Sequence, residues 1–196
     1  KTLADQGYTG RTMANKLIDK LNQVARAQPR WIRPSPQRGF AREGSQPPLD
    51  VEIPGGFKFS LRSLVNLAVT GLRRDSPKVV GEIVTLGRDE IELTVRTSEA
   101  AESKTRRKAN ALDEMLLSAA RSVYWTIRPT DLAFHDAADG NYPAAVEAIR
   151  EALRKEDAWG RLRASTLWAE LLREDGRHAE AHAKLTDALD LAPQSR

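Results

Sequence analysis

The stretch from residue 26 to residue 42 holds the side chains best suited to bind a ligand directly. From Lys20 to Arg42 there are six basic residues and no acidic residue, and two aromatic residues are interleaved with them. Cations neutralise phosphates and aromatic rings stack on bases, so this combination suits single-stranded nucleic acid, and it also suits anionic lipid headgroups. The candidate residues for such an anionic ligand are Arg30, Trp31, Arg33, Arg38, Phe40 and Arg42.

The same stretch also has a purely structural interpretation. Residues 28–48 are rich in Pro, Gly, Ser and Gln, which is typical of a long loop, because proline fixes φ and removes a backbone donor. Single arginines spaced between prolines form a weaker electrostatic surface than a clustered basic face. We therefore expect the loop to wrap its own domain with Trp31 buried, and nucleic-acid binding stays the alternative.

Two histidines have the i, i+4 spacing that metal ligands use on a helix. His178 and His182 lack the glutamate that follows the first histidine in zinc proteases, and no third ligand is evident. The chain also has no cysteine, which excludes disulfides, thiolate zinc sites and cysteine nucleophiles. No nucleophile elbow, Walker motif or dinucleotide-binding glycine pattern occurs. We therefore expect no catalytic residue, no metal, no cofactor and no enzymatic activity.

The charge is distributed unevenly along the 196 residues. Residues 1–130 hold 22 Lys and Arg against 14 Asp and Glu, whereas residues 131–196 hold 9 against 13. This shift indicates a boundary near Pro129, so we expect a basic domain over residues 1–128 and a second domain over residues 129–196.

No apolar run approaches the length of a membrane span, and the composition allows either the cytoplasm or the periplasm. Because the sequence starts with Lys1 rather than Met, we expect it to be a piece of a longer chain.

Apolar periodicity predicts the elements of the basic domain. Two β-branched runs around a short turn containing Gly87 indicate a β-hairpin. With a short strand before it, the hairpin makes a three-stranded sheet covered by helices, an α+β fold. The charged tract Lys104–Lys108 is interpreted as a solvated linker. The expected helices are 10–26, 60–72 and 112–127, and the expected strands are 49–53, 78–86 and 90–98.

The second domain repeats one phrase. "DGNYPAAVEAIREAL" begins at Asp139, and "DGRHAEAHAKLTDAL" begins 36 residues later, at Asp175. A period of this length with small residues at helical spacing is typical of stacked helical hairpins, because small side chains let paired helices approach closely. We therefore expect Gly140 and Gly176 each to join two antiparallel helices.

These residues resemble the tetratricopeptide repeat family. Trp168 and Ala169 match a large and then a small position of that family's first helix, and Pro193 matches its terminal proline. Ser165 stands at the early tryptophan position, Asp136 stands at the position of Leu172, and the spacing differs from the family's usual 34 residues. The resemblance implies that the following residues pack the hairpins together: Ala145, Ile149, Ala152, Trp168, Ala169, Leu172, Ala181, Leu185 and Ala188.

The resemblance also implies the function. Tetratricopeptide repeats bind other proteins, so we expect a non-enzymatic scaffold or adaptor whose hairpins hold a partner peptide or helix. The opening "LADQGYTGRTMANKLIDKLNQV" is similar to the region that precedes repeats in some bacterial membrane-anchored repeat proteins. The alternative function is a nucleic-acid-binding module that uses the loop over residues 26–42.

Overall fold

The structure is a computed structural model, and it divides into two compact units. Of the described residues, one unit holds 10–23 and those between 52 and 127, and the other holds 24–27 and 128–191, and each is described by itself. The described residues are 10–27, 52–53, 56–61, 79–86, 90–97 and 102–191.

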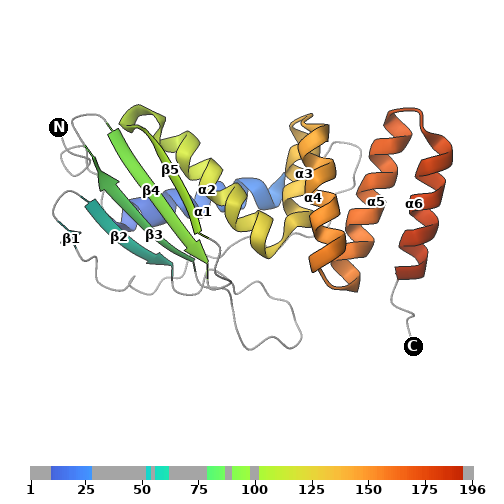
Figure 1. The fold of residues 1–196 in the computed structure, drawn as a ribbon, viewed down its shortest axis with the longest axis horizontal. Coiled ribbons are helices and arrows are strands. Elements are labelled where there is room, and N and C mark those ends of the chain that lie inside the picture. The colour runs from blue at the N-terminus through green and yellow to red at the C-terminus, as the bar shows by residue number, and fades with distance from the viewer. Residues whose placement is uncertain are drawn as a thin grey trace. The chain divides into compact units, whose positions relative to one another are not determined.

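The first unit contains a five-stranded antiparallel sheet in which every strand pairs with the next one along the chain. Figure 1 shows this meander together with helices, which confirms the predicted α+β fold. The strands are β1 (Glu52–Ile53), β2 (Gly56–Leu61), β3 (Val79–Thr85), β4 (Glu90–Thr97) and β5 (Glu102–Lys108).

The sheet has two strands more than the sequence predicted. Ser60, expected to cap a helix, instead pairs with Val80 within β2, and the rest of that expected helix, residues 62–72, lies outside the described residues. The tract Lys104–Lys108, interpreted as a linker, belongs to the edge strand β5. Charged side chains are tolerated on an edge strand, where one side of the backbone has no neighbour. A pattern search for apolar alternation misses such a strand.

Two helices cover one face of the sheet. The predicted helices over residues 10–26 and 112–127 are confirmed as α1 (Gly10–Arg26) and α2 (Leu112–Ile127), and α2 follows the short 3₁₀ helix η2 (Ala109–Ala111). In Figure 1, α1 passes behind the strands. The core below the sheet is made of side chains with almost no exposure: Met13, Leu17, Leu21, Ile83, Ile91, Leu93, Met115 and Leu116.

A polar contact joins the two covering helices. Lys16 and Lys20 on α1 reach the Asp113 carboxylate on α2, with N–O distances of 3.3 Å and 3.6 Å. The hydrogen bond from Lys16 lowers the pKa of Asp113, ahead of the charge attraction of both lysines. Because the Asp113 side chain is exposed, these pairs contribute little to the stability of the fold.

The described residues 128–191 of the second unit form four helices, arranged as two stacked hairpins. Each helix packs on the next one, and α3 also packs on α5. The helices are α3 (Pro129–Ala138), α4 (Tyr142–Lys155), α5 (Ala158–Glu174) and α6 (His178–Leu191). The predicted helical hairpins are therefore confirmed.

Capping residues fix where α4 and α5 begin. The Asn141 side chain accepts the Ala144 N–H at 3.4 Å, and the Asp157 side chain accepts the Gly160 N–H at 2.9 Å. Such caps satisfy backbone donors that have no partner inside the helix. Within the described part of the chain, no helix combines the length and apolar character needed to cross a membrane.

Candidate interaction surface

Both hairpins turn through the same backbone structure. Gly140 and Gly176 have φ of 76° and 75°, a conformation that favours glycine because other residues strain there. The next residue in each turn, Asn141 or Arg177, donates its N–H to a carbonyl five residues earlier, at 2.8 Å in both copies. This is the bonding of a helix end closed by a left-handed glycine. As predicted, each glycine joins two helices, and the two turns match at an offset of 36 residues.

Most residues expected to pack the hairpins are buried. Trp168 is half-buried, and Arg150 of α4 and Lys184 of α6 lie 6.0 Å and 4.9 Å from its ring centre. Leu185, expected among the packing residues, is instead 42% exposed. The buried members of the set are Ala145, Ile149, Ala152, Ala169, Leu172, Ala181 and Ala188.

Enlarging a buried alanine should therefore destabilise the second hairpin. Ala181→Leu should cost roughly 1–3 kcal/mol of unfolding free energy, because extra carbon atoms must be forced between packed helices. Ala183 lies on the exposed side of the same helix, so Ala183→Leu is the matched control and should stay within about 0.5 kcal/mol. Urea unfolding measures both, and equal stability of the two variants would mean that Ala181 does not face a helix contact.

A buried polar cluster ties α3 to the link between α4 and α5. Glu156, which ends α4, accepts the Thr130 N–H at 2.7 Å, and the Thr130 hydroxyl donates to the Gly160 carbonyl at 3.2 Å. Burial raises the pKa of Glu156 above its ordinary value. Asp131 next to Thr130 accepts from Arg163 of α5 at 3.0 Å. This cluster satisfies polar groups that packing would otherwise leave unpaired, and the sequence pattern did not identify it.

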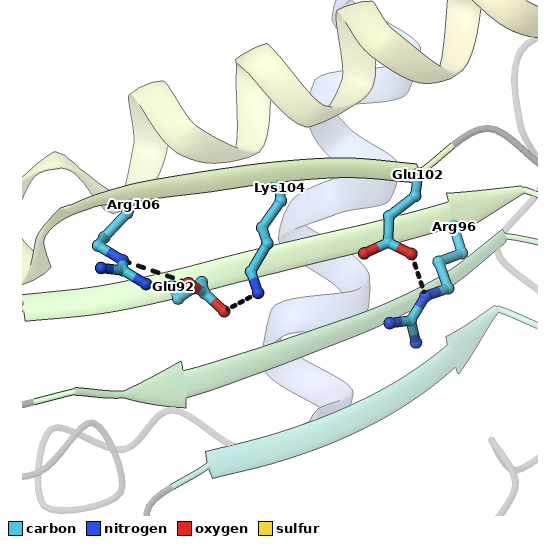
Figure 2. A network of polar contacts seen from close by, with 5 residues as sticks. All are labelled: Glu92, Arg96, Glu102, Lys104 and Arg106. Carbon is cyan, nitrogen blue, oxygen red and sulfur yellow. Dashed lines mark hydrogen bonds and ion pairs between the residues drawn. The ribbon is translucent and has the colours of Figure 1, made fainter.

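The face of the sheet turned away from α1 carries a second cluster, which Figure 2 shows. Glu92 on β4 is paired with Lys104 at 2.9 Å and with Arg106 at 2.8 Å, both on β5. Farther along, Arg96 pairs with Glu102 at 2.9 Å. The register explains the cluster, because Glu92 lies opposite Arg106 and Arg96 lies opposite Glu102. Glu92 thus pairs with two of the four cations of β5, while Glu102 of β5 pairs with Arg96 of β4.

The Glu92 cluster should make stability depend on pH in acid. The hydrogen bond from Lys104, followed by that from Arg106, lowers the pKa of Glu92 below 4.5. The ion pairs therefore stabilise the fold fully above pH 4.5, and this contribution is lost as the pH falls through the lower folded-state pKa. Glu92→Gln should flatten the fall of the melting temperature below pH 4.5. Glu90→Gln, at the exposed start of the same strand, is the control, and identical acid profiles for wild type and Glu92→Gln would contradict the prediction.

The remaining candidates are placed as follows. His178 and His182 are both exposed on α6, and the described residues contain no group of three potential metal ligands. The six residues proposed for an anionic ligand lie outside the described residues: Arg30, Trp31, Arg33, Arg38, Phe40 and Arg42.

Comparison with known proteins adds no family to this description. No protein-family model, no curated protein and no solved structure matches the chain. The functional argument therefore depends on the geometry of the two units.

Proposed function

We propose that this chain is a non-enzymatic protein-interaction module, a scaffold or adaptor, that holds a partner peptide or helix on its helical hairpins. The observation that carries the proposal is the use of one hairpin design twice, with matching turns at Gly140 and Gly176. Stacked copies of one hairpin build continuous surfaces that suit extended partners. The likeness of Trp168 and Ala169 to the tetratricopeptide pattern supports the same function.

Exposed apolar side chains on the hairpins add support. Tyr142 starts α4, Trp159 lies in the first turn of α5, and Leu189 lies near the end of α6, and all three are at least half exposed. The three lie on three different helices, and large apolar side chains that stay exposed are available for contact with a partner.

Photo-crosslinking in native cell extract tests the proposal. A photoreactive amino acid is placed singly at Tyr142, Trp159 or Leu189 on the hairpins, and at Val80 or Leu86 on the sheet as matched exposed controls. We expect specific protein adducts from hairpin positions and none from the sheet positions. Adducts confined to the sheet positions, or adducts from no position, would contradict the proposal.

Nucleic-acid binding, the alternative function, is tested by a separate titration. A labelled oligonucleotide is titrated with the chain at two salt concentrations. Binding through the loop arginines should weaken with salt, with log K falling by roughly 0.7–0.9 per log unit of salt for each phosphate contact. Salt-dependent binding that is lost when Arg30, Arg33, Arg38 and Arg42 are replaced would favour the nucleic-acid function, and we expect none.

A further inference from the structure

One edge of the sheet is a strongly basic strand. β5 pairs with β4 on one side and has no second neighbour among the described strands (Figure 1). An edge strand offers the backbone N–H and C=O groups of its open side to another strand. We call this open side of β5, with its side chains, the β5 edge. Four of the seven residues of β5 are cations and one is acidic: Lys104, Arg106, Arg107 and Lys108, and Glu102.

Most of these charges lie on one exposed face. Successive side chains of a strand alternate between the two faces of the sheet. Helix α2 packs on both β4 and β5, and Ser103 and Thr105 are half-buried. Lys104 and Arg106 keep 55% and 58% of their side chains exposed. Alternation places four residues of β5 on the face that carries the Glu92 cluster (Figure 2): Glu102, Lys104, Arg106 and Lys108.

The contacts with β4 leave hydrogen-bonding capacity on two of these cations. Arg106 gives two N–H donors, at Nε and Nη2, to Glu92, and a guanidinium group has five. Lys104 makes one contact of 2.9 Å with the same carboxylate, and an ammonium group has three donors. A carboxylate on a strand beside β5 can therefore bind Lys104 or Arg106 without displacing Glu92.

We infer that the β5 edge binds an extended acidic segment of another protein, which adds a further strand to the sheet. The site belongs to the first unit and is independent of the partner proposed for the hairpins. Main-chain hydrogen bonds supply the affinity of such a complex, and side chains at alternate positions supply its selectivity. The pairing of β4 with β5 already follows this rule, because Glu92 lies opposite Arg106.

Charge separates this partner from a second copy of the chain. In an antiparallel pair of β5 strands centred on Thr105, Lys104 of each copy lies opposite Arg106 of the other. Like charges directly opposite each other destabilise a sheet, and charged side chains on an edge oppose such pairing. The same charges favour a strand that carries carboxylates.

Other occupants also match the β5 edge less well. The two long segments of this chain outside the described residues, 28–51 and 62–78, each carry more basic than acidic residues, so they do not complement it. Nucleic acid would bring its phosphates near Glu90, Glu92 and Glu102, and β5 has no aromatic residue on which a base could stack.

Fluorescence anisotropy with designed peptides tests the inference. A labelled peptide as long as the seven residues of β5, in which glutamate alternates with valine, is titrated with the full chain. The control peptide has lysine in place of each glutamate. We expect saturable binding of the glutamate peptide and none of the lysine peptide.

Variants of the chain locate the binding. The double variant Lys104→Gln and Lys108→Gln should bind the glutamate peptide about fivefold more weakly, because two cross-strand charge pairs are lost. The double variant Arg173→Gln and Arg177→Gln removes two cations of similar exposure from the second unit and should bind like wild type. Circular dichroism checks that both variants remain folded.

Two N-methylated peptides separate strand addition from attraction between charges. A strand added at an edge uses every second N–H to pair with its neighbour. Methyl groups on one alternate set of amides should therefore abolish binding, and methyl groups on the other set should leave it largely intact. This comparison uses the wild-type chain, so it remains decisive even if the lysine variant does not fold.

Four results would overturn the inference. An absence of saturable binding would mean that the β5 edge is already covered, and equal binding of both methylated peptides would mean that no strand is added. A dimer that Lys104→Gln and Lys108→Gln dissociate in sedimentation would assign the edge to a second copy, and oligonucleotide binding lost in that variant would assign it to nucleic acid. The photo-crosslinks from the hairpins test the proposed function separately.

Discussion

Ile149→Ala is expected to lower the unfolding free energy by about 2–5 kcal/mol, because it removes a large side chain from a closed contact and leaves a cavity. Leu185→Ala, at the equivalent position 36 residues later, is expected to cost less than about 1 kcal/mol. Ile149 has no exposed surface, whereas Leu185 is 42% exposed. The pair thus compares one position of the repeat with and without a helix packed over it.

Urea unfolding followed by far-ultraviolet circular dichroism measures both variants, with the slope m checked for each. A large cost at Leu185 would mean that this side chain is already enclosed in the free protein. A small cost at Ile149 would mean that α5 does not cover α4. Either result would contradict the difference in burial between these two equivalent positions.

Gly160→Ala is expected to lower the unfolding free energy by about 2–5 kcal/mol, from overpacking together with a lost hydrogen bond. The new Cβ would lie 2.7 Å from the Cβ of Glu156 and 1.9 Å from its Oε2. Because the Glu156 Cβ is fixed to the backbone, rotating the side chain cannot relieve the contact. Displacing Glu156 also removes the acceptor of the Thr130 N–H.

Glu156→Gln is the matched control for this prediction. It keeps an oxygen acceptor for Thr130 and removes the charge. Burial raises the pKa of Glu156, so the charged form is disfavoured in the folded protein and stability falls as the pH rises through the folded-state pKa. The glutamine variant should therefore equal or exceed wild type at neutral pH. Thermal unfolding that places Gly160→Ala level with Glu156→Gln would show that the close contact is absent.

The hairpins could be predicted because their determinants are local. A glycine after an acidic residue, a fresh apolar period and small residues at helical spacing placed the turns at Gly140 and Gly176. The exposure of Leu185 could not be predicted in this way. The repeat assigns it the environment of Ile149, but burial depends on whether a further helix follows in space, and a local pattern holds no such information.

The sequence analysis did not predict strands β2 and β5, for two different reasons. The segment of β2, with Phe57, Phe59 and Leu61 alternating with polar residues, carried a strand signal that the capping potential of Ser60 outweighed. In β5, by contrast, the tract Lys104–Lys108 has no apolar alternation at all. Its pairing arises from β4, whose Glu92 and Arg96 lie opposite complementary charges. Such cross-strand complementarity becomes visible only when the register is known.

The polar cluster around Thr130 also depends on distant residues. Glu156 lies 26 residues after Thr130, and Gly160 lies 30 residues after it. None of the three residues belongs to a motif. Only Gly160 gives an indirect signal in the sequence. It lies in the first turn of a helix, where glycine lowers helix propensity. Gly160 is therefore explained by the close approach of Glu156.

Amide hydrogen exchange across the hairpin helices tests the central claim most directly. The full chain is compared with and without a partner protein identified from its photo-crosslinks to Tyr142, Trp159 or Leu189. Binding should slow exchange in helices α4 to α6, because a bound partner suppresses local opening of the helices beneath it, and exchange in β3 to β5 should not change. Unchanged exchange in α4 to α6 at a saturating concentration of the partner, or protection confined to the sheet, would contradict the account.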